Sequence, residues 1–275
     1  MKIKEILKIG NKKLSNITEA NLKLRLLISK IIDKPKEFLI THNEEEITKI
    51  QENKILEGIE KLSNNIPIQY IINEQEFMGI KFFVDENVLI PQPDTEILVE
   101  QVIKNCKDAN KKILDLCTGS GCIAISLKKY IPQVKIFASD ISSEALEIAK
   151  KNAKQNNTEI NFIESDLFQN INNEKFDIIA SNPPYIKQDV IKTLDKEVQN
   201  EPNIALDGGK DGLDFYRKII KESYEYLAND GKLYLEIGYD QKEDLIDLYN
   251  KDGRYKNINC IKDLANNDRV IVIEK

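Results

Sequence analysis

The segment Asn182-Pro183-Pro184-Tyr185 places hydrogen-bond acceptors directly after a short apolar run, Phe176–Ala180. The run predicts a buried parallel strand, and the two prolines end it because they cannot donate to a sheet. Pro183 and Pro184 keep their carbonyls but lack N–H groups, and Asn182 adds a side-chain carbonyl. Such a site suits an NH2 group whose nitrogen is aimed at an electrophile, with Tyr185 covering a flat amide or base. The alternative for these four residues alone is a proline-stiffened loop without chemistry.

A glycine-rich turn is the second feature that indicates ligand binding. It comprises Cys117, Thr118, Gly119, Ser120 and Gly121. The apolar segment before it, Lys112–Leu116, predicts a strand, and Cys122–Tyr130 after it predicts a helix. Glycine lets the backbone approach a ligand closely, and the start of the helix supplies free N–H groups. We therefore expect the turn to bind a cofactor.

Acidic residues follow the next two predicted strands. Val134–Ser139 predicts a strand that ends in Asp140, about 20 residues past the turn, where an acidic side chain can hold both ribose hydroxyls. A third predicted strand, Ile160–Glu164, leads into Asp166 and Leu167. Asp166 can accept from an adenine amino group, and Leu167 can pack on the ring. The turn lacks the third glycine of dinucleotide-binding sequences, so we expect a nucleoside without phosphates.

Strands alternate with helices through the rest of this region. The further predicted elements are helix Ser143–Gln155, a glycine-rich surface loop at Gly208–Gly212, helix Leu213–Leu227, strand Lys232–Ile237, helix Gln241–Asn250 and strand Arg269–Ile273. This alternation predicts an α/β fold with a doubly wound parallel sheet, whose ligands bind at the carboxyl ends of its strands. Asp115, Asp140, Asp166 and Asn182 all fall at such ends.

The first part of the chain has a different character. Residues 1–72 contain only two glycines and are rich in Lys, Glu, Ile, Leu and Asn, which predicts short amphipathic helices. The expected helices are Ile17–Ile32, a segment around Glu44–Ile50, and Ile55–Leu62. We expect residues 1–72 to form a helical domain that helps to recognise the substrate.

A linker follows this helical domain. Glu76–Ile90 alternates apolar and polar residues around turn-forming ones, which predicts a β-hairpin between two domains. Asp94 or Thr95 then caps the next helix. We therefore expect residues 73–275 to hold the linker and the catalytic domain.

Composition excludes several classes of protein. The single histidine, His42, argues against Ser-His-Asp and Cys-His hydrolases and against histidine-based metal sites, and we expect no metal. Four cysteines without paired spacing argue against zinc ribbons and disulfide scaffolds. A net charge of −6 disfavours a protein that grips duplex nucleic acid. The chain has neither a membrane-length apolar run nor a secretory signal pattern, so we expect a cytoplasmic protein.

The motifs together resemble one family. Beyond the glycine turn and Asn-Pro-Pro-Tyr, the matching segments are Ile66–Ile71, Glu76–Phe82, Leu89–Val99, Glu201–Arg217 and Leu235–Gln241. With these segments the chain resembles the release-factor glutamine methyltransferases, known as PrmC or HemK, among the S-adenosylmethionine-dependent methyltransferases. Asn-Pro-Pro-Tyr alone is shared with DNA adenine methyltransferases, whereas the flanking set is much more specific.

This resemblance implies a fold, a cofactor and a substrate. The implied fold is a seven-stranded methyltransferase sheet with a helical N-terminal domain, and the implied cofactor is S-adenosylmethionine. The implied substrate is the glutamine of the Gly-Gly-Gln motif in class-one peptide release factors, bound by a monomer without stable nucleic-acid binding. The amide would lie against Asn182, Pro183, Pro184 and Tyr185, with Asn182 also next to the cofactor. Asn182, Pro183 and Tyr185 would then be catalytic.

Two residues depart from the family pattern. Gln92 stands where the family usually has an arginine, so any ionic role of that residue is lost or has moved. Asn73 replaces a frequent glycine. Neither lies in the cofactor turn or in Asn-Pro-Pro-Tyr.

Two other classes of function remain open. A nucleic-acid amine methyltransferase would use the same acceptor motif, but it predicts a basic recognition domain, whereas residues 1–72 mix both charges and contain Arg25 as their only arginine. A non-catalytic nucleoside-binding protein would leave the acceptor motif free to decay, and here the motif is whole. A ribosomal-protein glutamine is a closer alternative substrate, which only the resemblance excludes.

Overall fold

The computed structural model describes residues 1–106, 108, 110–172 and 174–275. The chain divides into two compact units. Unit 1 is Met1–Glu74 together with Asp195–Asn200, and unit 2 is Gln75–Leu194 together with Glu201–Lys275. Within the described residues, no helix has the length and apolar character needed to cross a membrane.

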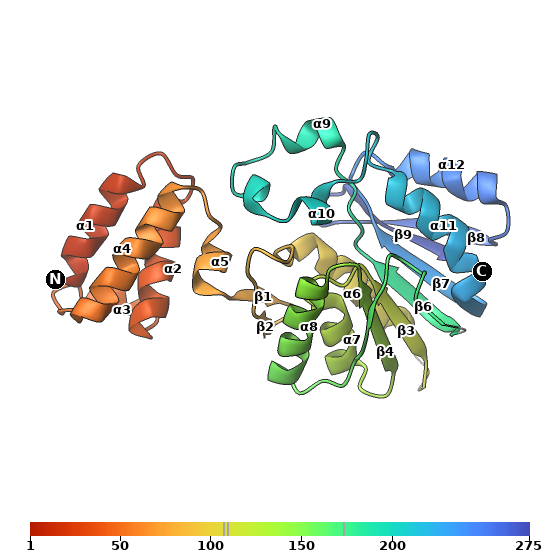
Figure 1. Cartoon of the computed structure of the whole chain (residues 1–275), viewed down its shortest axis with the longest axis horizontal. Coiled ribbons are helices and arrows are strands. Elements are labelled where there is room, and N and C mark those ends of the chain that lie inside the picture. Colours follow the sequence, from red (N-terminus) through yellow and green to blue (C-terminus); the bar gives the residue numbers. More distant parts are fainter. Residues whose placement is uncertain (107, 109, 173) are drawn as a thin grey trace. The chain divides into compact units, whose positions relative to one another are not determined.

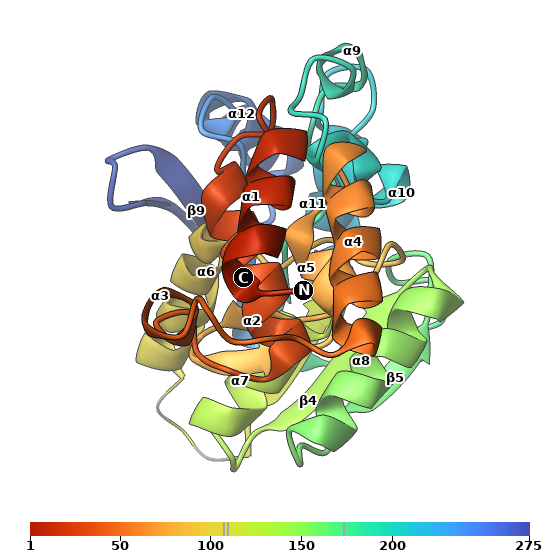
Figure 2. The ribbon, with the colours of Figure 1, turned by 90° about the vertical axis from the view of Figure 1, so that its left-hand side faces the viewer.

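Unit 1 is helical. Its helices are α1 (Ile3–Lys13), α2 (Ala20–Ile32), α3 (Phe38–Thr41), α4 (Lys49–Ser63) and α5 (Ile68–Ile72), with a short 3-10 turn, η1 (Val198–Asn200). The long helices α1, α2 and α4 pack against one another (Figure 2) around an apolar core that includes Leu24, Leu27 and Ile55. The segment Asp195–Asn200 contacts the helices of this unit through an ion pair between Glu197 and Lys23 of α2.

The helix α4 replaces two predicted elements. We expected separate helices around Glu44–Ile50 and at Ile55–Leu62, but a single helix begins at Lys49. Thr48 starts it: its hydroxyl accepts from the N–H of Gln51 over 3.2 Å, and Gln51 Oε1 accepts from the N–H of Thr48 over 2.9 Å. This reciprocal capping box satisfies two backbone donors and fixes the helix start. The acidic run before it therefore lies outside the helix.

Unit 2 contains a hairpin and a large sheet (Figure 1). Its strands are β1 (Gln75–Phe77), β2 (Ile80–Phe82), β3 (Lys112–Leu116), β4 (Lys135–Asp140), β5 (Asn161–Glu164), β6 (Phe176–Ser181), β7 (Leu227–Glu236), β8 (Asn257–Lys262) and β9 (Asp268–Glu274). Its helices are α6 (Pro93–Asn105), α7 (Cys122–Tyr130), α8 (Ser143–Gln155), α9 (Gln188–Ile191), α10 (Asn203–Leu206), α11 (Asp214–Tyr226) and α12 (Lys242–Asp252).

The hairpin is shorter than the alternation predicted. Strands β1 and β2 pair antiparallel across Met78 and Gly79, both in the left-handed region. The segment from Phe83 to Ile90 is irregular and does not continue the second strand. Asn73, at the end of α5, also has a left-handed backbone with φ 51°. Asparagine tolerates that conformation better than most residues, which explains why it can stand where a glycine is frequent.

The large sheet confirms the predicted seven-stranded, doubly wound fold. Its order is β5-β4-β3-β6-β7-β9-β8, and β9 runs antiparallel to both of its neighbours. Strand β8 was not among the predicted strands because its sequence is polar and only part-buried, which is typical of the edge of a sheet.

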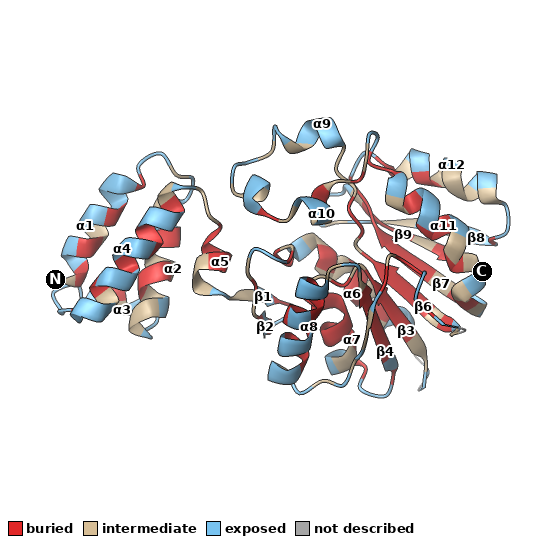
Figure 3. Ribbon diagram, in the orientation of Figure 1, coloured by how far each residue is buried: buried red, intermediate tan, exposed pale blue. Residues whose placement is uncertain are grey.

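Apolar side chains cover both faces of this sheet. One face packs against α6 and α7 through residues such as Val99 and Ile123, and the other packs against α11 through Tyr216 and Ile219. The strands are therefore buried while the outer faces of the helices are exposed (Figure 3). A parallel sheet covered on both faces leaves its strand ends as the accessible edge.

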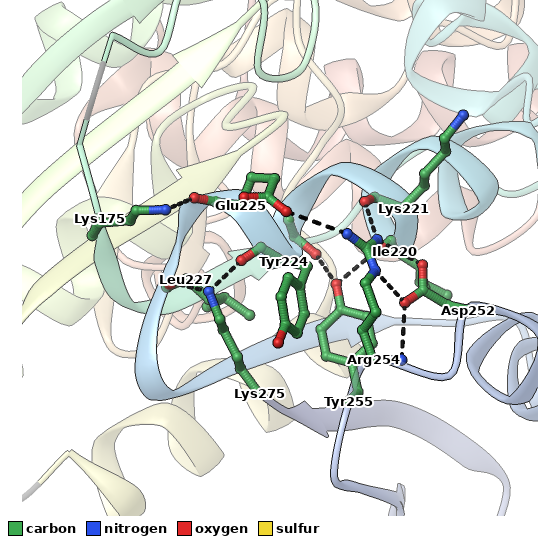
Figure 4. A network of polar contacts seen from close by, with 11 residues as sticks. Lys175, Ile220, Lys221, Tyr224, Glu225, Leu227, Asp252, Arg254, Tyr255 and Lys275 are labelled. Atoms are coloured by element: carbon green, nitrogen blue, oxygen red, sulfur yellow. Dashed lines mark hydrogen bonds and ion pairs between the residues drawn. The ribbon is translucent and has the colours of Figure 1, made fainter.

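A polar network secures the turn from α11 into β7 (Figure 4). Lys275 Nζ donates to the carbonyls of Tyr224 and Leu227 over 2.6 and 2.9 Å. The Arg254 guanidinium lies 4.7 Å from the centre of the Tyr224 ring and pairs with Asp252. These contacts lie at the amino end of β7. They stabilise the fold at the edge opposite to the carboxyl ends of the parallel strands.

Candidate active site

The centre of the sheet provides the usual position for a ligand. The chain order reverses between β3 and β6, and ligands of doubly wound sheets bind beyond the carboxyl ends of the strands at such a point. Leu116 of β3 pairs with Ser181 of β6, and Ser181 Oγ donates to the Leu116 carbonyl over 2.6 Å. Both strands therefore end at the same level. The residues that follow, Cys117 and Asn182, leave the sheet at this edge.

A cavity of about 300 Å³ lies there. Of the predicted site residues, it is lined by Cys117, Gly119, Asp140, Asp166, Leu167, Asn182 and Pro184. Thr118, Ser120, Gly121, Pro183 and Tyr185 are not among its lining residues. The other lining residues include Asn87, Val88, Leu89, Ile204, Ala205 and Phe215, which sequence reasoning did not assign to the site. Residues from four predicted strand ends, from one earlier segment and from two later segments thus share one cavity.

The carboxyl of Asp115 stabilises the glycine turn through two hydrogen bonds. Its side chain is fully buried, and Oδ2 accepts from the Thr118 hydroxyl over 2.5 Å and from the N–H of Ala124 over 3.1 Å. Burial raises the pKa of this carboxyl to about 7, while the two hydrogen bonds oppose the rise. Asp115 and Thr118 therefore shape the turn, and neither lines the cavity.

The carboxyl of Asp140 also stabilises this turn through a hydrogen bond from its backbone. One oxygen accepts from the N–H of Gly119 over 2.8 Å, and the other accepts from the N–H of Ser142 over 3.0 Å. Burial raises its pKa, and these backbone hydrogen bonds oppose the rise. A Cβ built on Gly119 would meet no heavy atom within 4 Å. The space in front of Gly119 is therefore open to a ligand that lies against the backbone.

Leu167 lies at another wall of the cavity. Its backbone is left-handed with φ 48°, and Ser165 Oγ donates to its carbonyl over 2.7 Å. The N–H of Asn170 donates back to Ser165 Oγ over 3.0 Å, which closes the turn. The turn therefore holds Asp166 and the Leu167 side chain next to each other on the cavity.

The Asn182 carboxamide has a defined orientation. Its Nδ2 donates to Thr95 Oγ1 over 3.1 Å, and Thr95 lies on α6 with only 2% of its surface exposed. Among the described residues, no hydrogen bond is made to Asn182 Oδ1. The acceptor atom of Asn182 is thus left available beside the cavity. We expected Asp94 or Thr95 to cap α6, but Gln92 occupies the cap position and Pro93 begins the helix.

Tyr185 is held at both its backbone and its hydroxyl. The hydroxyl donates to Glu236 Oε1 over 3.3 Å, and the Tyr185 carbonyl accepts from Gln241 Nε2 over 3.0 Å. Burial raises the Tyr185 pKa well above its ordinary value. A Cβ on Gly208 would lie 2.7 Å from Tyr185 Cα, so only glycine allows this approach. The loop predicted as a surface loop at Gly208–Gly212 therefore has buried ends that support Tyr185.

Sequence reasoning missed Thr95, Glu236 and Gln241 as neighbours of the site. Glu236 had a detectable signal, because it is a polar residue at the carboxyl end of an apolar strand, like Asp140 and Asn182. Thr95 and Gln241 had none, since a helix start and a loop residue both tolerate polar side chains at the surface. Gln92, which replaces the family arginine, is exposed and donates to the Ile90 carbonyl over 3.0 Å.

Two family models match the chain. Residues 5–72 match the PrmC N-terminal domain, and residues 91–209 match the methyltransferase small domain. Among solved structures, a methyltransferase from Pyrococcus furiosus is similar, with a TM-score of 0.56 and 20% identity, over 83% of this chain and 99% of that one. At this identity the likeness supports the fold alone.

Curated relatives match almost from end to end. A release factor glutamine methyltransferase from Clostridium botulinum is 41% identical over 97% of this chain and 96% of its own. Another from Thermodesulfovibrio yellowstonii is 42% identical over 100% of this chain and 97% of its own. With the methyltransferase fold and a cavity at the carboxyl ends of the central strands, these matches show that the chain belongs to the release factor glutamine methyltransferase family.

Proposed function

We propose that this enzyme transfers a methyl group from S-adenosylmethionine to the side-chain amide nitrogen of a glutamine, the one in the Gly-Gly-Gln motif of class-one peptide release factors. The family relationship supports the reaction. The observation that carries it is the orientation of Asn182, whose Nδ2 is bound by Thr95 while Oδ1 remains available beside the cavity. An acceptor in this position suits an incoming NH2 group.

The cavity fits the proposed cofactor. When bound, S-adenosylmethionine supplies an electrophilic methyl group on a positively charged sulfur. A volume of about 300 Å³ is within the range for small-molecule sites. We assign the ribose hydroxyls to Asp140, the adenine amino group to Asp166 and the adenine face to Leu167. The open space at Gly119 supports close contact with the backbone of the turn, for which Cys117, Thr118, Ser120 and Gly121 provide the frame.

The protein must activate a poor nucleophile. The lone pair of an amide nitrogen is delocalised into its carbonyl group. We propose that Asn182 Oδ1 and the Pro183 carbonyl accept the two hydrogens, which favours a pyramidal nitrogen aimed at the methyl group. The nitrogen lone pair then forms the new N–C bond as the S–C bond breaks, and the cationic amide loses a proton to water. Tyr185 and Pro184 pack against the flat amide, and no histidine base is needed.

Positioning supplies most of the rate in this scheme. Well-oriented reactants lower a barrier by roughly 7–11 kcal/mol. The acceptors are therefore useful only if their own positions are fixed. The two consecutive prolines, Pro183 and Pro184, restrict the backbone at this point. The contacts of Asn182 with Thr95 and of Tyr185 with Glu236 restrict the side chains.

We propose that residues 1–72 recognise the release factor. Their match to the PrmC N-terminal domain supports this role. Residues 73–275 would then carry the hairpin linker and the catalytic domain. Because peptide release takes place on cytoplasmic ribosomes, a cytoplasmic enzyme is also proposed, working as a monomer on one release factor.

The substrate class can be tested by label transfer. The protein is incubated with methyl-labelled S-adenosylmethionine and, separately, with a class-one release factor, its Gly-Gly-Gln glutamine-to-alanine variant, ribosomal proteins, and duplex DNA. We expect label on the unmodified release factor alone. Label on DNA would instead indicate a nucleic-acid amine methyltransferase, and label on ribosomal proteins alone would replace the proposed partner.

A further inference from the structure

A set of buried side chains lies behind the acceptor residues. Thr95 comes from α6, Glu236 from the end of β7, and Asn182 and Tyr185 from the segment after β6. Asn182 Nδ2 donates to Thr95 Oγ1 over 3.1 Å, and Tyr185 Oη donates to Glu236 Oε1 over 3.3 Å. Thr95 and Glu236 are 2% and 1% exposed. These two hydrogen bonds join side chains and are not part of the backbone ladder of the sheet or of α6.

The direction of the hydrogen bonds matters for the reaction. A threonine hydroxyl has one proton, so when Thr95 Oγ1 accepts from Asn182 it must direct that proton to another acceptor. The adjacent acceptor is the carboxyl of Glu236, whose pKa the Thr95 hydroxyl lowers. Oε2 of Glu236 is buried and makes no hydrogen bond among the described residues, so it is the acceptor still available to the Thr95 proton. An ionised carboxylate only accepts, and therefore keeps Thr95 available as an acceptor.

The backbone and charges around Glu236 hold its carboxyl in place. Tyr216 Oη donates to the Glu236 carbonyl over 2.7 Å, which anchors the end of the strand. The guanidinium of Arg269 favours the ionised form, as does the Tyr185 hydroxyl, whereas Asp94 and burial oppose it. Arg269 itself pairs with Asp94 and Asp263 over 3.1 and 3.2 Å. Glu236 therefore accepts from Tyr185 through Oε1, and its unpartnered Oε2 is the acceptor that we assign to the Thr95 hydroxyl.

We propose that Thr95 and Glu236 are positioning residues that keep the Asn182 carboxamide turned with Oδ1 toward the substrate amine and hold Tyr185 beside it. This inference rests on the proposed function. If the carboxamide rotated by half a turn, its NH2 would face the NH2 of the substrate, and two groups of donors would oppose each other. The rotated carboxamide would offer no acceptor to the substrate amine. Thr95 Oγ1 would then face Asn182 Oδ1 instead of an N–H donor. The network makes that orientation unfavourable before the substrate arrives.

Removing the Thr95 hydroxyl tests this role. Thr95→Val keeps the shape but cannot accept from Asn182, and Thr95→Ser keeps the hydroxyl. We expect Thr95→Val to lower kcat for release-factor methylation by roughly 10- to 100-fold, as for the loss of one buried hydrogen-bond partner. KM for the release factor and Kd for the cofactor should stay within about threefold, because neither ligand touches Thr95 in this scheme. Thr95→Ser should restore most of kcat.

A second buried hydroxyl provides the control. Ser223 lies on α11 and shares a hydrogen bond of 2.8 Å with the Tyr255 hydroxyl, far along the chain from the acceptor segment. Ser223→Ala removes a buried hydrogen bond of similar kind, so it should lower thermal stability while leaving kcat unchanged. If Thr95→Val retains the wild-type kcat, or if Thr95→Ser remains as slow as Thr95→Val while both are folded, the positioning role is wrong.

A double-mutant cycle identifies the residue through which Thr95 acts. In Asn182→Asp both side-chain atoms are acceptors, so no carboxamide orientation remains to be fixed. We expect Thr95→Val to cost less than about threefold in this background, far less than in the wild type, because interacting residues give non-additive effects. Equal losses in both backgrounds would show that Thr95 acts elsewhere.

The pH profile provides a separate test for Glu236. Burial raises its pKa to about 7. The titratable or charged groups that face it are Tyr185, Asp94, Arg269, Tyr216 and Cys122, and the Thr95 hydroxyl faces it as well. The ionised form can accept from both Thr95 and Tyr185, so kcat should rise as the pH rises through about 7. Glu236→Gln should be folded, slower, and lack this rise. An identical profile in wild type and Glu236→Gln would remove Glu236 from the network.

A measurement without turnover separates this inference from the proposed function. The side-chain amide protons of Asn182 can be followed by NMR in the ligand-free protein. They should exchange with water more rapidly in Thr95→Val than in the wild type or Thr95→Ser. If the wild type does not label a release factor, the proposed function fails, yet protected amide protons would still support the orientation. Equal exchange rates of the Asn182 amide protons in Thr95→Val and the wild type would overturn the proposed role of Thr95.

Discussion

The carboxylate of Asp140 accepts a hydrogen bond from the backbone N–H of Gly119 over 2.8 Å, joining the end of β4 to the turn after β3. One side chain therefore sets the shape of the glycine turn and also lines the cavity. This double role explains why an acidic residue at this strand end affects the site even without a ligand. It also means that substitutions here must be judged by binding and by stability together.

Asp140→Ala is expected to weaken cofactor binding. The change removes the proposed acceptor for the ribose hydroxyls and leaves the Gly119 and Ser142 N–H groups without their partner. The affinity for S-adenosylmethionine should fall by roughly 10- to 100-fold, the cost of losing one or two charge-assisted hydrogen bonds. Isothermal titration calorimetry gives the affinity, and thermal unfolding reports any loss of fold. An unchanged affinity would reject the assignment of Asp140 to the ribose.

Gly119→Ala should separate binding from stability. Gly119 has φ 52° and a Cβ there would meet no protein atom within 4 Å. The strained backbone should cost about 1 kcal/mol of unfolding free energy. The free energy of cofactor binding should weaken by more than this stability cost, because the alanine methyl group would occupy the space proposed for the ligand.

Gly79→Ala provides the matched control for Gly119→Ala. Gly79 lies in the turn between β1 and β2 with φ 67°, and a Cβ there would meet only the Tyr130 hydroxyl, at 4.0 Å. Its stability cost should be similar, but its cofactor affinity should match that of the wild type. If calorimetry finds the same affinity for both alanine variants, the open space at Gly119 is not the cofactor site.

Asn182→Ala should reduce turnover while leaving cofactor binding nearly unchanged. The variant removes the proposed acceptor for the substrate NH2, and its effect should be roughly 100-fold or more on kcat, similar to the loss of one preorganised catalytic dipole. Single-turnover methylation of a release factor measures the chemical step, and calorimetry with the cofactor is the control. A variant with near wild-type kcat would exclude Asn182 from the chemistry.

Glu201→Gln should change how stability depends on pH. Glu201 Oε2 accepts from the N–H of Ile90 over 2.9 Å, and burial raises the pKa of the carboxyl from 4.5 to about 7. Between these two values the folded protein keeps a proton that the unfolded chain has released, so wild-type stability falls as the pH rises through this window. Glutamine does not titrate and can still accept from Ile90. The stability of Glu201→Gln should therefore not show this decrease as the pH rises.

Urea unfolding at several pH values measures the effect. At pH 8 Glu201→Gln should be more stable than the wild type by about 1–3 kcal/mol, and the difference should disappear near pH 4.5. Glu147→Gln, at an exposed position of α8, should differ from the wild type by less than about 0.5 kcal/mol throughout. A constant difference between Glu201→Gln and wild type at every pH would contradict the proposed cause.

Local patterns in the sequence predicted much of the fold. Period-two and continuous apolar runs indicated β3, β4 and β6 because a buried parallel strand needs apolar side chains on both faces. The same logic failed at Glu44–Ile50, where acidic residues suggested a helix and the capping box of Thr48 with Gln51 began it later. It also missed β8, since an edge strand needs few apolar residues.

The sequence by itself determined where polar residues follow strands, and so it indicated Asp140, Asp166 and Asn182 before any coordinates. This works because the carboxyl ends of parallel strands meet at one edge, so positions far apart in the chain can be assigned to a common site. Only the tertiary structure decided which way the Asn182 carboxamide faces. Its partner Thr95 lies on α6 and the carboxyl beside Thr95 comes from β7, and no pattern along the chain specifies contacts between side chains of separate elements.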